Sequence, residues 1–282
     1  MIEKNADTFD AASTTALARR IRLQCLHMCH TKRASHLGGA FSVADVLAVL
    51  YGGLMTTNPA QPKSPDRDRL FYSKGHACTA LYATLAETGY YPLAALDTFT
   101  DNGSDFTSHV NHKVPGVELS TGSLGHALSV AAGVALAGKR RKAAWHTYAI
   151  VSDGELDEGS NWEAILFAPH HRLDNLTLVV DYNKIQSFGS TADVLNLDPL
   201  ADKFKAFNWE TIEVDGHDHA ALAAALSKQG RNGKPRVVIA HTVKGKGVSF
   251  MENQLAWHYK SPDAAQFGAA RAELLQESKD QA

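Results

Sequence analysis

The sequence has few cysteines, little net charge and no long apolar run, and each absence excludes a class of protein. Three cysteines in 282 residues cannot all pair, and a chain of this length needs no covalent staple, so we expect a reducing, cytoplasmic location. With 28 basic and 30 acidic residues, the net charge of −2 offers no broad basic surface for nucleic acid. No run approaches about 18 apolar residues, and the polar segment 1–10 lacks a signal-peptide pattern.

The composition is otherwise that of a globular protein, except for 14 histidines, which is a high number. Apolar residues make up 44% of the chain, which excludes a disordered protein. The length permits one large domain or two small ones. Because no linker, low-complexity tract or repeat divides the chain, we interpret residues 1–282 as one domain, with a core over about 15–262 and a less regular tail over 263–282.

Helix and strand signals alternate along the chain. Strands that are apolar throughout and alternate with helices predict an α/β fold with a doubly wound, mostly parallel sheet. Ser42 to Asp45 fit a capping box that would open a helix over 43–54. The Gly-, Pro- and Ser-containing segment 101–123 predicts a long loop, and such loops are usually functional. The predicted strands are 70–72, 148–151, 176–180, 211–214 and 236–242, and the predicted helices are about 17–28, 43–54, 77–88, 125–138, 161–171 and 218–227.

Polar residues follow two of the predicted strands. Asp153 and Gly154 follow strand 148–151, and Asn183 follows strand 176–180, so we expect these strand ends to lie side by side, where ligands bind in such sheets. Carboxylate and amide oxygens suit Mg²⁺, and a glycine lets the backbone approach a bulky anion. Each residue alone is typical of an ordinary turn or cap, and only the combination is specific.

The combination resembles the thiamine diphosphate motif, which opens with Gly-Asp-Gly and closes with Asn. Here Asn183 follows Asp153 by 30 positions, and Ser152 replaces the first glycine. The resemblance implies that Asp153, Asn183 and the backbone carbonyl of Ile185 bind Mg²⁺, or Ca²⁺ or Mn²⁺ in its place. This ion would bridge the diphosphate of the cofactor.

Further motifs extend the resemblance to the transketolase family over about residues 15–262. The matching segments are 35–40 around His36, 70–77 around His76, His109 with 114–125, 242–247, and 257–258. The resemblance implies the diphosphate-binding (PP-type) fold. It also implies transfer of a two-carbon ketol unit from a ketose or ketose phosphate donor to an aldose acceptor.

Four histidines carry most of the chemistry that the resemblance implies. His36 and His258 would assist deprotonation of a substrate hydroxyl, and His76 and His109 would hold the ketose oxygens and the carbanion-like intermediate. Histidine suits these steps because its ordinary pKa of about 6.5 permits both donation and acceptance near neutral pH. The resemblance also implies cofactor contacts by Gly122 and Leu124 of the thiazolium loop and by Gly154, Glu158 and Glu163. The two glutamates would lie in a network across a subunit interface.

Several other residues have simpler interpretations. Glu155 and Asp157 fit a solvated acidic face near a helix start. Cys25, Cys29 and His30 resemble a zinc cluster, but on a helix they are better explained by packing. The histidines interpreted as ordinary surface or core residues are His27, His30, His146, His170, His171, His217 and His219.

The glutamate that activates the cofactor in this family belongs to a pyrimidine-binding domain, which these 282 residues do not resemble. We therefore expect the N-terminal subunit of a split transketolase, working in a heterotetramer with a second chain that supplies that domain. The alternatives are a non-catalytic scaffold, a deoxyxylulose-phosphate synthase and the alpha chain of a 2-oxoacid dehydrogenase. Departures from the family pattern at Val110, His126 and segment 186–189 leave the scaffold open. Segment 70–77 and the close at 257–258 argue against the dehydrogenase chain, and Glu158 argues against the synthase.

Overall fold

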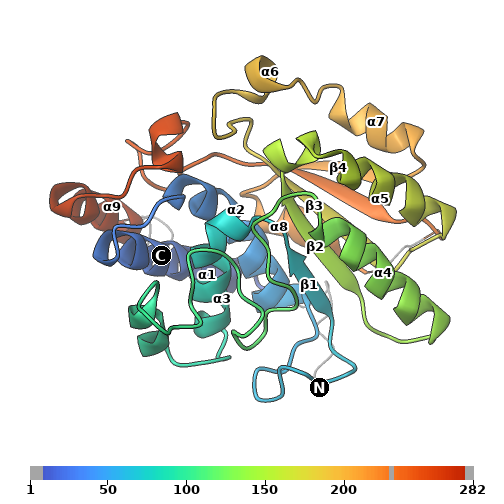
Figure 1. The fold of residues 1–282 in the computed structure, drawn as a ribbon, viewed down its shortest axis with the longest axis horizontal. Coiled ribbons are helices and arrows are strands. Elements are labelled where there is room, and N and C mark those ends of the chain that lie inside the picture. Colours follow the sequence, from blue (N-terminus) through green and yellow to red (C-terminus); the bar gives the residue numbers. More distant parts are fainter. Residues whose placement is uncertain (1–8, 229–231, 277–282) are drawn as a thin grey trace.

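The computed structural model describes residues 9–228 and 232–276 and is built around a five-stranded parallel sheet (Figure 1). The strand order is β1-β2-β3-β5-β4, and every neighbouring pair is parallel. The strands are β1 (Arg69–Tyr72), β2 (Thr147–Ser152), β3 (Leu176–Tyr182), β4 (Glu210–Asp215) and β5 (Arg236–His241). The α/β prediction and all five predicted strands are therefore confirmed.

Helices cover both faces of this sheet, as a doubly wound fold requires (Figure 1). One face carries α1 (Ala11–Thr31), α2 (Leu37–Val49), α3 (Cys78–Glu87), α8 (His219–Leu226) and, outside them, α9 (Ala264–Gln276). The other face carries α4 (Ala127–Arg140), α5 (Gly159–His170) and α7 (Leu200–Ala206). The one-turn helix α6 (Thr191–Val194) lies in the connection from β3 to α7.

Strand side chains alternate between two apolar layers. In β2, Tyr148 and Ile150 pack in the layer of α1, α2 and α3, whereas Ala149 and Val151 pack in the layer of α4 and α5. Every residue of β2 and β3 is buried. A strand buried on both faces has no polar side to display, which is why these segments appear in the sequence as continuous apolar runs.

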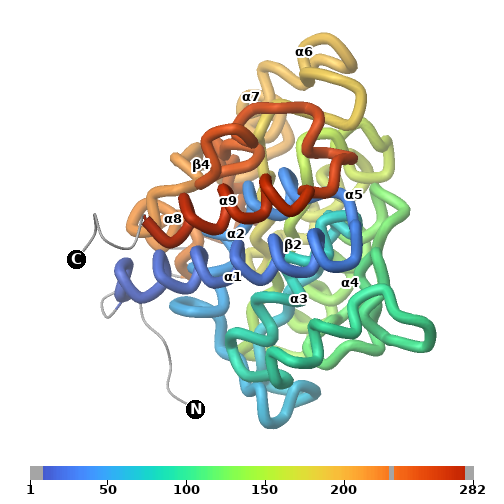
Figure 2. Tube along the Cα trace, turned by 90° about the vertical axis from the view of Figure 1, so that its left-hand side faces the viewer, coloured from blue at the N-terminus to red at the C-terminus, as the bar shows by residue number. Residues whose placement is uncertain are grey.

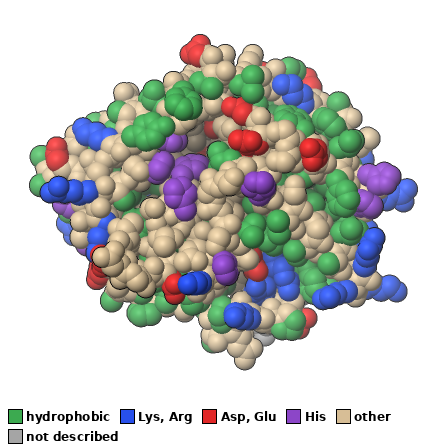
Figure 3. Space-filling view, viewed as in Figure 1, with side chains coloured by type: hydrophobic (Ala, Val, Ile, Leu, Met, Phe, Trp, Pro, Cys, Tyr) green, Lys and Arg blue, Asp and Glu red, His purple; other side chains and the backbone are tan. Residues whose placement is uncertain are grey.

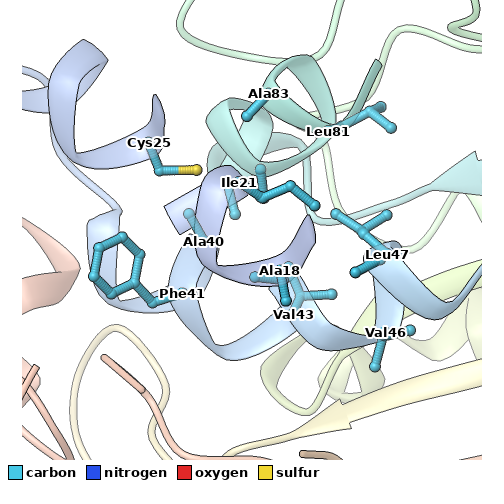
Figure 4. Close-up of a cluster of buried hydrophobic side chains, with 14 of the residues drawn as sticks. Ala18, Ile21, Cys25, Ala40, Phe41, Val43, Val46, Leu47, Leu81 and Ala83 are labelled. Carbon is cyan, nitrogen blue, oxygen red and sulfur yellow. The ribbon is translucent and has the colours of Figure 1, made fainter. Parts of the chain in front are cut away.

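Helix α2 is the centre of one layer and is buried along its whole length. Figure 4 shows Phe41 and Leu47 of this helix among side chains of the same apolar cluster, including Ile21 of α1 and Leu81 of α3. The segment Leu37–Leu54, α2 with the π-helical turn after it, is long and apolar enough to cross a membrane by length and composition. Because 89% of it is buried inside the fold, the segment is explained as a core helix.

The predicted start of this helix at Ser42 is wrong. Helix α2 begins at Leu37, and its N-cap is His36, which adopts a left-handed backbone conformation (φ 70°). The Ser42 hydroxyl lies inside the helix and donates to Gly39 O and to the Asp181 carboxylate, so it caps nothing. Because α2 is buried on every side, its sequence has no polar face. The amphipathic pattern from which the start of a helix is predicted is therefore missing.

The segment expected to be a less regular tail contains helix α9, which lies along α1 (Figure 2). The ring of Phe267 in α9 stacks on His30 of α1 with 4.4 Å between centroids. His30 Nδ1 also bonds to Pro262 O at 2.9 Å. A regular helix therefore occupies residues 264–276 of this tail, and residues 277–282 lie outside the described part of the chain.

Candidate functional site

A cavity of about 220 Å³ opens at the carboxyl ends of β1, β2 and β3. Parallel strands end at one edge of a sheet, and the register pairs Ser152 of β2 with Asp181 of β3. This pairing brings the segments after β2 and β3 together, as the sequence predicted. The cavity is lined by His36, Gly39, Lys74, His76, Gly122, Leu124, Ser152, Asp153, Gly154, Asn183, Ile185, Gln186, Ser187, Lys244, His258 and Tyr259.

Histidine side chains gather in a hollow of this face (Figure 3). The His36 ring lies 5.3 Å from His76, 5.0 Å from His258 and 6.4 Å from His109, between centroids. They come from four separate places: the N-cap of α2, the turn after β1, the loop 101–123 and the turn Leu255–His258. His36, His76 and His258 line the cavity, and His109 is an exposed residue at its rim.

Burial keeps three of these imidazoles neutral. Loss of solvent, with smaller contributions from His109 and Lys244, lowers the pKa of His36 to about 4. Burial and then Lys244 lower the pKa of His258 to about 3, and burial holds the pKa of His76 well below its ordinary value. A neutral imidazole has one donor and one acceptor nitrogen, which suits proton transfer at a hydroxyl group.

Asp153 and Asn183 offer oxygens at neighbouring strand ends. Asp153 accepts backbone N–H groups of Gly154 (2.8 Å) and Lys184 (2.6 Å), and Asn183 Oδ1 accepts that of Ile185 (3.1 Å). Burial raises the pKa of Asp153 to about 6. In the described structure no cationic side chain pairs directly with this carboxylate, so its oxygens remain available to a cation.

Two lysines of the site were not among the predicted site residues. The Lys74 ammonium is buried in an ion pair with the Asp181 carboxylate, which also accepts the Ser42 and Thr242 hydroxyls. A lysine and an aspartate placed directly after apolar strands were the sequence signals for this pair, since such groups are rarely buried without a partner.

The second lysine, Lys244, lies in the turn after β5 and is also buried. Its Nζ donates to Ile185 O at 2.8 Å and lies 3.0 Å from His258 Nδ1. Burial and then Lys74 lower its pKa to about 8. Lys244 therefore brings positive charge to the predicted metal-ligating carbonyl and to one of the histidines.

The loop 101–123 contains no helix or strand, as predicted, and Gly122 near its end and Leu124 directly after it line the cavity. Its backbone passes so close to the turn after β1 that a Cβ on Gly75 would lie 2.4 Å from Thr121 O. Gly122 adopts φ 156°, and a Cβ there would lie 2.8 Å from the His109 ring. Both glycines thus permit a close approach of backbone that any side chain would block.

The acidic residues after β2 do not form one solvated face. Glu155 is fully buried, where it accepts the Ser73 hydroxyl and the Gly125 N–H (2.9 Å), so the solvated interpretation is wrong for this residue. Through these bonds it joins the strand end that carries His76 to the loop that carries Gly122. Glu158 and Glu163 are exposed at the start of α5 and lie outside the cavity lining. Their assignment to a subunit interface remains a prediction.

The residues with simpler interpretations are placed in the core or bonded to neighbours. Cys25 and Cys29 are buried residues of α1 that pack in its apolar layer, and burial raises the pKa of Cys25 to about 12. His146 and His219 are buried and bonded to Thr177 (2.8 Å) and Thr14 (2.8 Å). Within residues 9–228 and 232–276, no three His, Cys, Asp or Glu side chains form a group suited to a metal ion.

Comparisons with known proteins agree with this geometry. Residues 13–279 match the family model of the transketolase, thiamine diphosphate binding domain. The chain is 41% identical to one subunit of the apulose-4-phosphate transketolase of Actinobacillus succinogenes, over 96% of this chain and 98% of that protein. It is 43% identical to one subunit of the 6-deoxy-6-sulfo-D-fructose transketolase of Clostridium sp., over 86% of this chain and 89% of that protein.

A solved structure gives the same result for the fold. Transketolase from Leishmania mexicana superposes with a TM-score of 0.86 and 29% identity, over 94% of this chain. The match covers 42% of that longer protein, whereas it covers nearly all of the Actinobacillus protein. The chain therefore belongs to the transketolase family, as a thiamine diphosphate-binding subunit that is similar to the corresponding chains of two-subunit transketolases.

Proposed function

We propose that this chain binds the diphosphate of thiamine diphosphate through a divalent cation and, with a second subunit, transfers a two-carbon ketol unit from a ketose to an aldose. The observation that carries the proposal is the meeting of Asp153, Asn183 and three neutral histidines in one cavity at the carboxyl edge of the sheet. A scaffold that only binds a partner has no use for a buried, unpaired carboxylate beside this cluster.

The donor set supports Mg²⁺ as the cation. Asp153 supplies a carboxylate, Asn183 an amide oxygen and Ile185 a carbonyl, and hard oxygens of this kind suit Mg²⁺, which also binds phosphate oxygens. The raised pKa of Asp153 indicates a carboxylate that a cation would stabilise in its charged form. The carbonyl of Ile185 now accepts Lys244 Nζ at 2.8 Å, so Lys244 lies where it can bond to either the carbonyl or a diphosphate.

The histidines supply the proton chemistry on the substrate side of the cavity. When bound, thiamine diphosphate supplies a nucleophilic carbon and an electron sink for breaking a carbon–carbon bond. His36 and His258 would accept or return the proton of a substrate hydroxyl, since both rings are neutral and lie 5.0 Å apart. His76, whose ring lies 5.3 Å from that of His36 and 5.8 Å from that of His258, would hold a ketose oxygen through its donor nitrogen. These roles follow the family resemblance and the positions of the rings.

A partner subunit is supported by the surface around the cavity. Phe188, which follows the lining residue Ser187, is 82% exposed, and Tyr259, which lines the cavity itself, is 58% exposed. Large exposed rings such as Phe188 and Tyr259 beside a polar site favour a surface that another chain covers. The similar proteins are themselves named as subunits. We infer that the partner carries the pyrimidine-binding domain with its activating glutamate, and that two copies of each chain form a heterotetramer.

The names of the similar proteins narrow the substrate class. One acts on apulose 4-phosphate and the other on 6-deoxy-6-sulfo-D-fructose, so both use a ketose that carries an anionic group. We propose a phosphorylated or otherwise anionic ketose as the donor for this chain too.

The test is reconstitution with the partner subunit. Thiamine diphosphate binding is measured with and without Mg²⁺, and ketol transfer is then measured from a panel of anionic and neutral ketoses. We expect Mg²⁺-dependent binding and transfer by the complex and no transfer by the isolated chain. Absence of binding at millimolar cofactor supports the scaffold alternative, and full transfer by the isolated chain contradicts the need for a partner.

A further inference from the structure

A network of four polar side chains, three of them buried and one partly buried, links α1, α2 and the segment that follows β4. We call it the Asp45 network, and it consists of Arg22, Asp45, His217 and His219. Asp45 of α2 accepts from Arg22 of α1, from His217 Nδ1 (2.7 Å) and from His219 Nε2 (3.0 Å). Burial opposes the charge of Asp45, but Arg22 and the two imidazoles outweigh it and hold its pKa well below the ordinary value. Asp45 is therefore an ionised acceptor inside the protein.

His217 connects this network to the cavity, and His219 does not. His217 Nε2 accepts the backbone N–H of Val243 at 2.8 Å. An N–H group donates only to a nitrogen that lacks a proton, so the proton of His217 lies on Nδ1 and is donated to Asp45. The second nitrogen of His219 instead bonds to Thr14 Oγ1 at 2.8 Å, away from the turn that follows β5.

His217 can contact Val243 because the loops that follow β4 and β5 approach each other closely. Gly216 N donates to His241 O at 2.8 Å, and a Cβ on Gly216 would lie 2.3 Å from the Thr242 side chain. The residue that follows Val243 is Lys244, whose Nζ reaches Ile185 O and His258 in the cavity. The backbone N–H that His217 holds, that of Val243, is therefore directly followed by Lys244, whose ammonium group reaches the cavity.

We infer that His217 is a positioning residue: in its Nδ1–H tautomer, set by Asp45, it fixes the backbone from which Lys244 reaches the cavity. The inference deepens the proposed function and rests on it for the role of Lys244. His219 provides the matched control, because it makes an equivalent bond to Asp45 without touching the turn 242–247. A purely structural role predicts that His217→Ala and His219→Ala behave alike.

The first experiment needs no cofactor. Amide hydrogen exchange of the full chain is measured for both alanine variants. With its acceptor removed, the Val243 amide is expected to exchange about tenfold faster in His217→Ala, because loss of one hydrogen bond shifts the opening equilibrium of the turn by roughly this factor. His219→Ala should leave exchange across 242–247 unchanged, while both variants lower the melting temperature.

The second experiment measures thiamine diphosphate affinity in the reconstituted complex with Mg²⁺. The dissociation constant should rise about tenfold in His217→Ala and stay unchanged in His219→Ala. His217→Gln, whose carbonyl reaches the position of Nε2, should restore affinity. His217→Asn keeps a donor near Asp45 but lacks that acceptor, so it should reproduce the loss even if the alanine variant does not fold.

The outcomes separate the two proposals. Equal exchange and equal affinity in the His217 and His219 variants overturn the positioning role. If the wild-type complex binds no thiamine diphosphate, the proposed function fails, and the exchange comparison alone then decides whether His217 fixes the turn.

Discussion

The two edges of the parallel sheet use the same types of side chain with opposite results. At the amino edge, the buried Asp68 carboxylate accepts backbone N–H groups of Thr56 and His146 (both 2.7 Å) and pairs with Lys228 Nζ (2.5 Å). At the carboxyl edge, the buried Asp153 carboxylate accepts two N–H groups in the same way but has no direct ion pair among the described residues. The two carboxylates therefore differ in one respect: Asp68 has a lysine partner, and Asp153 has none among the described residues.

The histidines and lysines at the two edges of the sheet differ in the same way as the two aspartates. His146 at the amino edge bonds to Thr177, whereas His36, His76 and His258 at the carboxyl edge face one another across a cavity. Lys228 has a carboxylate partner, whereas Lys244 bonds to a carbonyl and an imidazole. Polar groups that satisfy each other stabilise a fold, and polar groups left incompletely paired in a cavity indicate a ligand.

The largest effect is expected when Asp153 or Asp68 is replaced, one at a time, by asparagine. Asp153→Asn should weaken Mg²⁺-dependent cofactor binding more than about 100-fold, because even groups that only support a metal ligand contribute 10–100-fold. Asp68→Asn should leave affinity unchanged and destabilise the chain by about 3 kcal/mol, since it leaves Lys228 unpaired at a buried carboxylate site. Calorimetric titration of the complex and thermal denaturation of each chain measure the two effects.

The same two variants, Asp153→Asn and Asp68→Asn, also test the pKa of Asp153. Its folded value of about 6 exceeds that of an unfolded aspartate, so its contribution to stability is favourable only when it is protonated and is lost as the pH rises through about 6. At pH 7.5 and without a cation, Asp153→Asn should therefore raise the melting temperature, whereas Asp68→Asn lowers it. A lower melting temperature for both would contradict the distinction between the edges.

The second largest effect is expected at the histidines. His76→Ala should preserve cofactor binding and slow turnover by roughly 10²–10⁴-fold, the range for loss of a group that moves or holds a proton. His146→Ala at the amino edge should lower the melting temperature and preserve turnover per folded complex. Steady-state kinetics with cofactor at saturation separate the two, and normal turnover in His76→Ala removes that residue from the mechanism.

A smaller effect is expected at the lysines. Lys244→Met should raise the dissociation constant for thiamine diphosphate by about 10–100-fold, because hydrogen bonds to charged groups contribute about 1.5–3 kcal/mol. Lys228→Met leaves Asp68 without its ammonium partner and should change stability only. Similar affinities in the two variants would show that the cation of Lys244 plays no part in binding.

The smallest effect is the response of the cofactor-free chain to acid. The pKa values of His36 and His258, about 4 and about 3, lie below that of an unfolded histidine. Between pH 6.5 and 4 the unfolded state therefore binds protons that the folded state does not, and stability falls. His36→Asn with His258→Asn should flatten this fall by about 2–4 °C in melting temperature. His170→Asn, which removes an imidazole at the end of α5 and outside the cavity lining, is the control variant for this measurement.

The sequence predicted the part of the site that consecutive residues encode. Asp153 and Asn183 were found because each follows an apolar strand directly, and the parallel sheet brings such strand ends together. His36, His76 and His258 were found by family resemblance, since an isolated histidine gives no signal of its own. The start of α2 was misplaced because the helix is buried on every side.

The groups that were missed depend on contacts between distant segments. Glu155 joins β1 to a loop, the Lys74–Asp181 pair joins two strand ends, and His217 joins α2 to the turn after β5. Each of these residues has an ordinary exposed interpretation when only its neighbours in sequence are considered.

By itself, the amino-acid sequence determined the class of fold, the order of the strands along the chain and the oxygen-bearing side chains at two strand ends, because local apolar patterns and turn residues specify these features. Only the tertiary structure decided which buried charges are paired and which are left for a ligand. Burial and pairing depend on every segment that packs around a group, and no pattern of neighbouring residues records them.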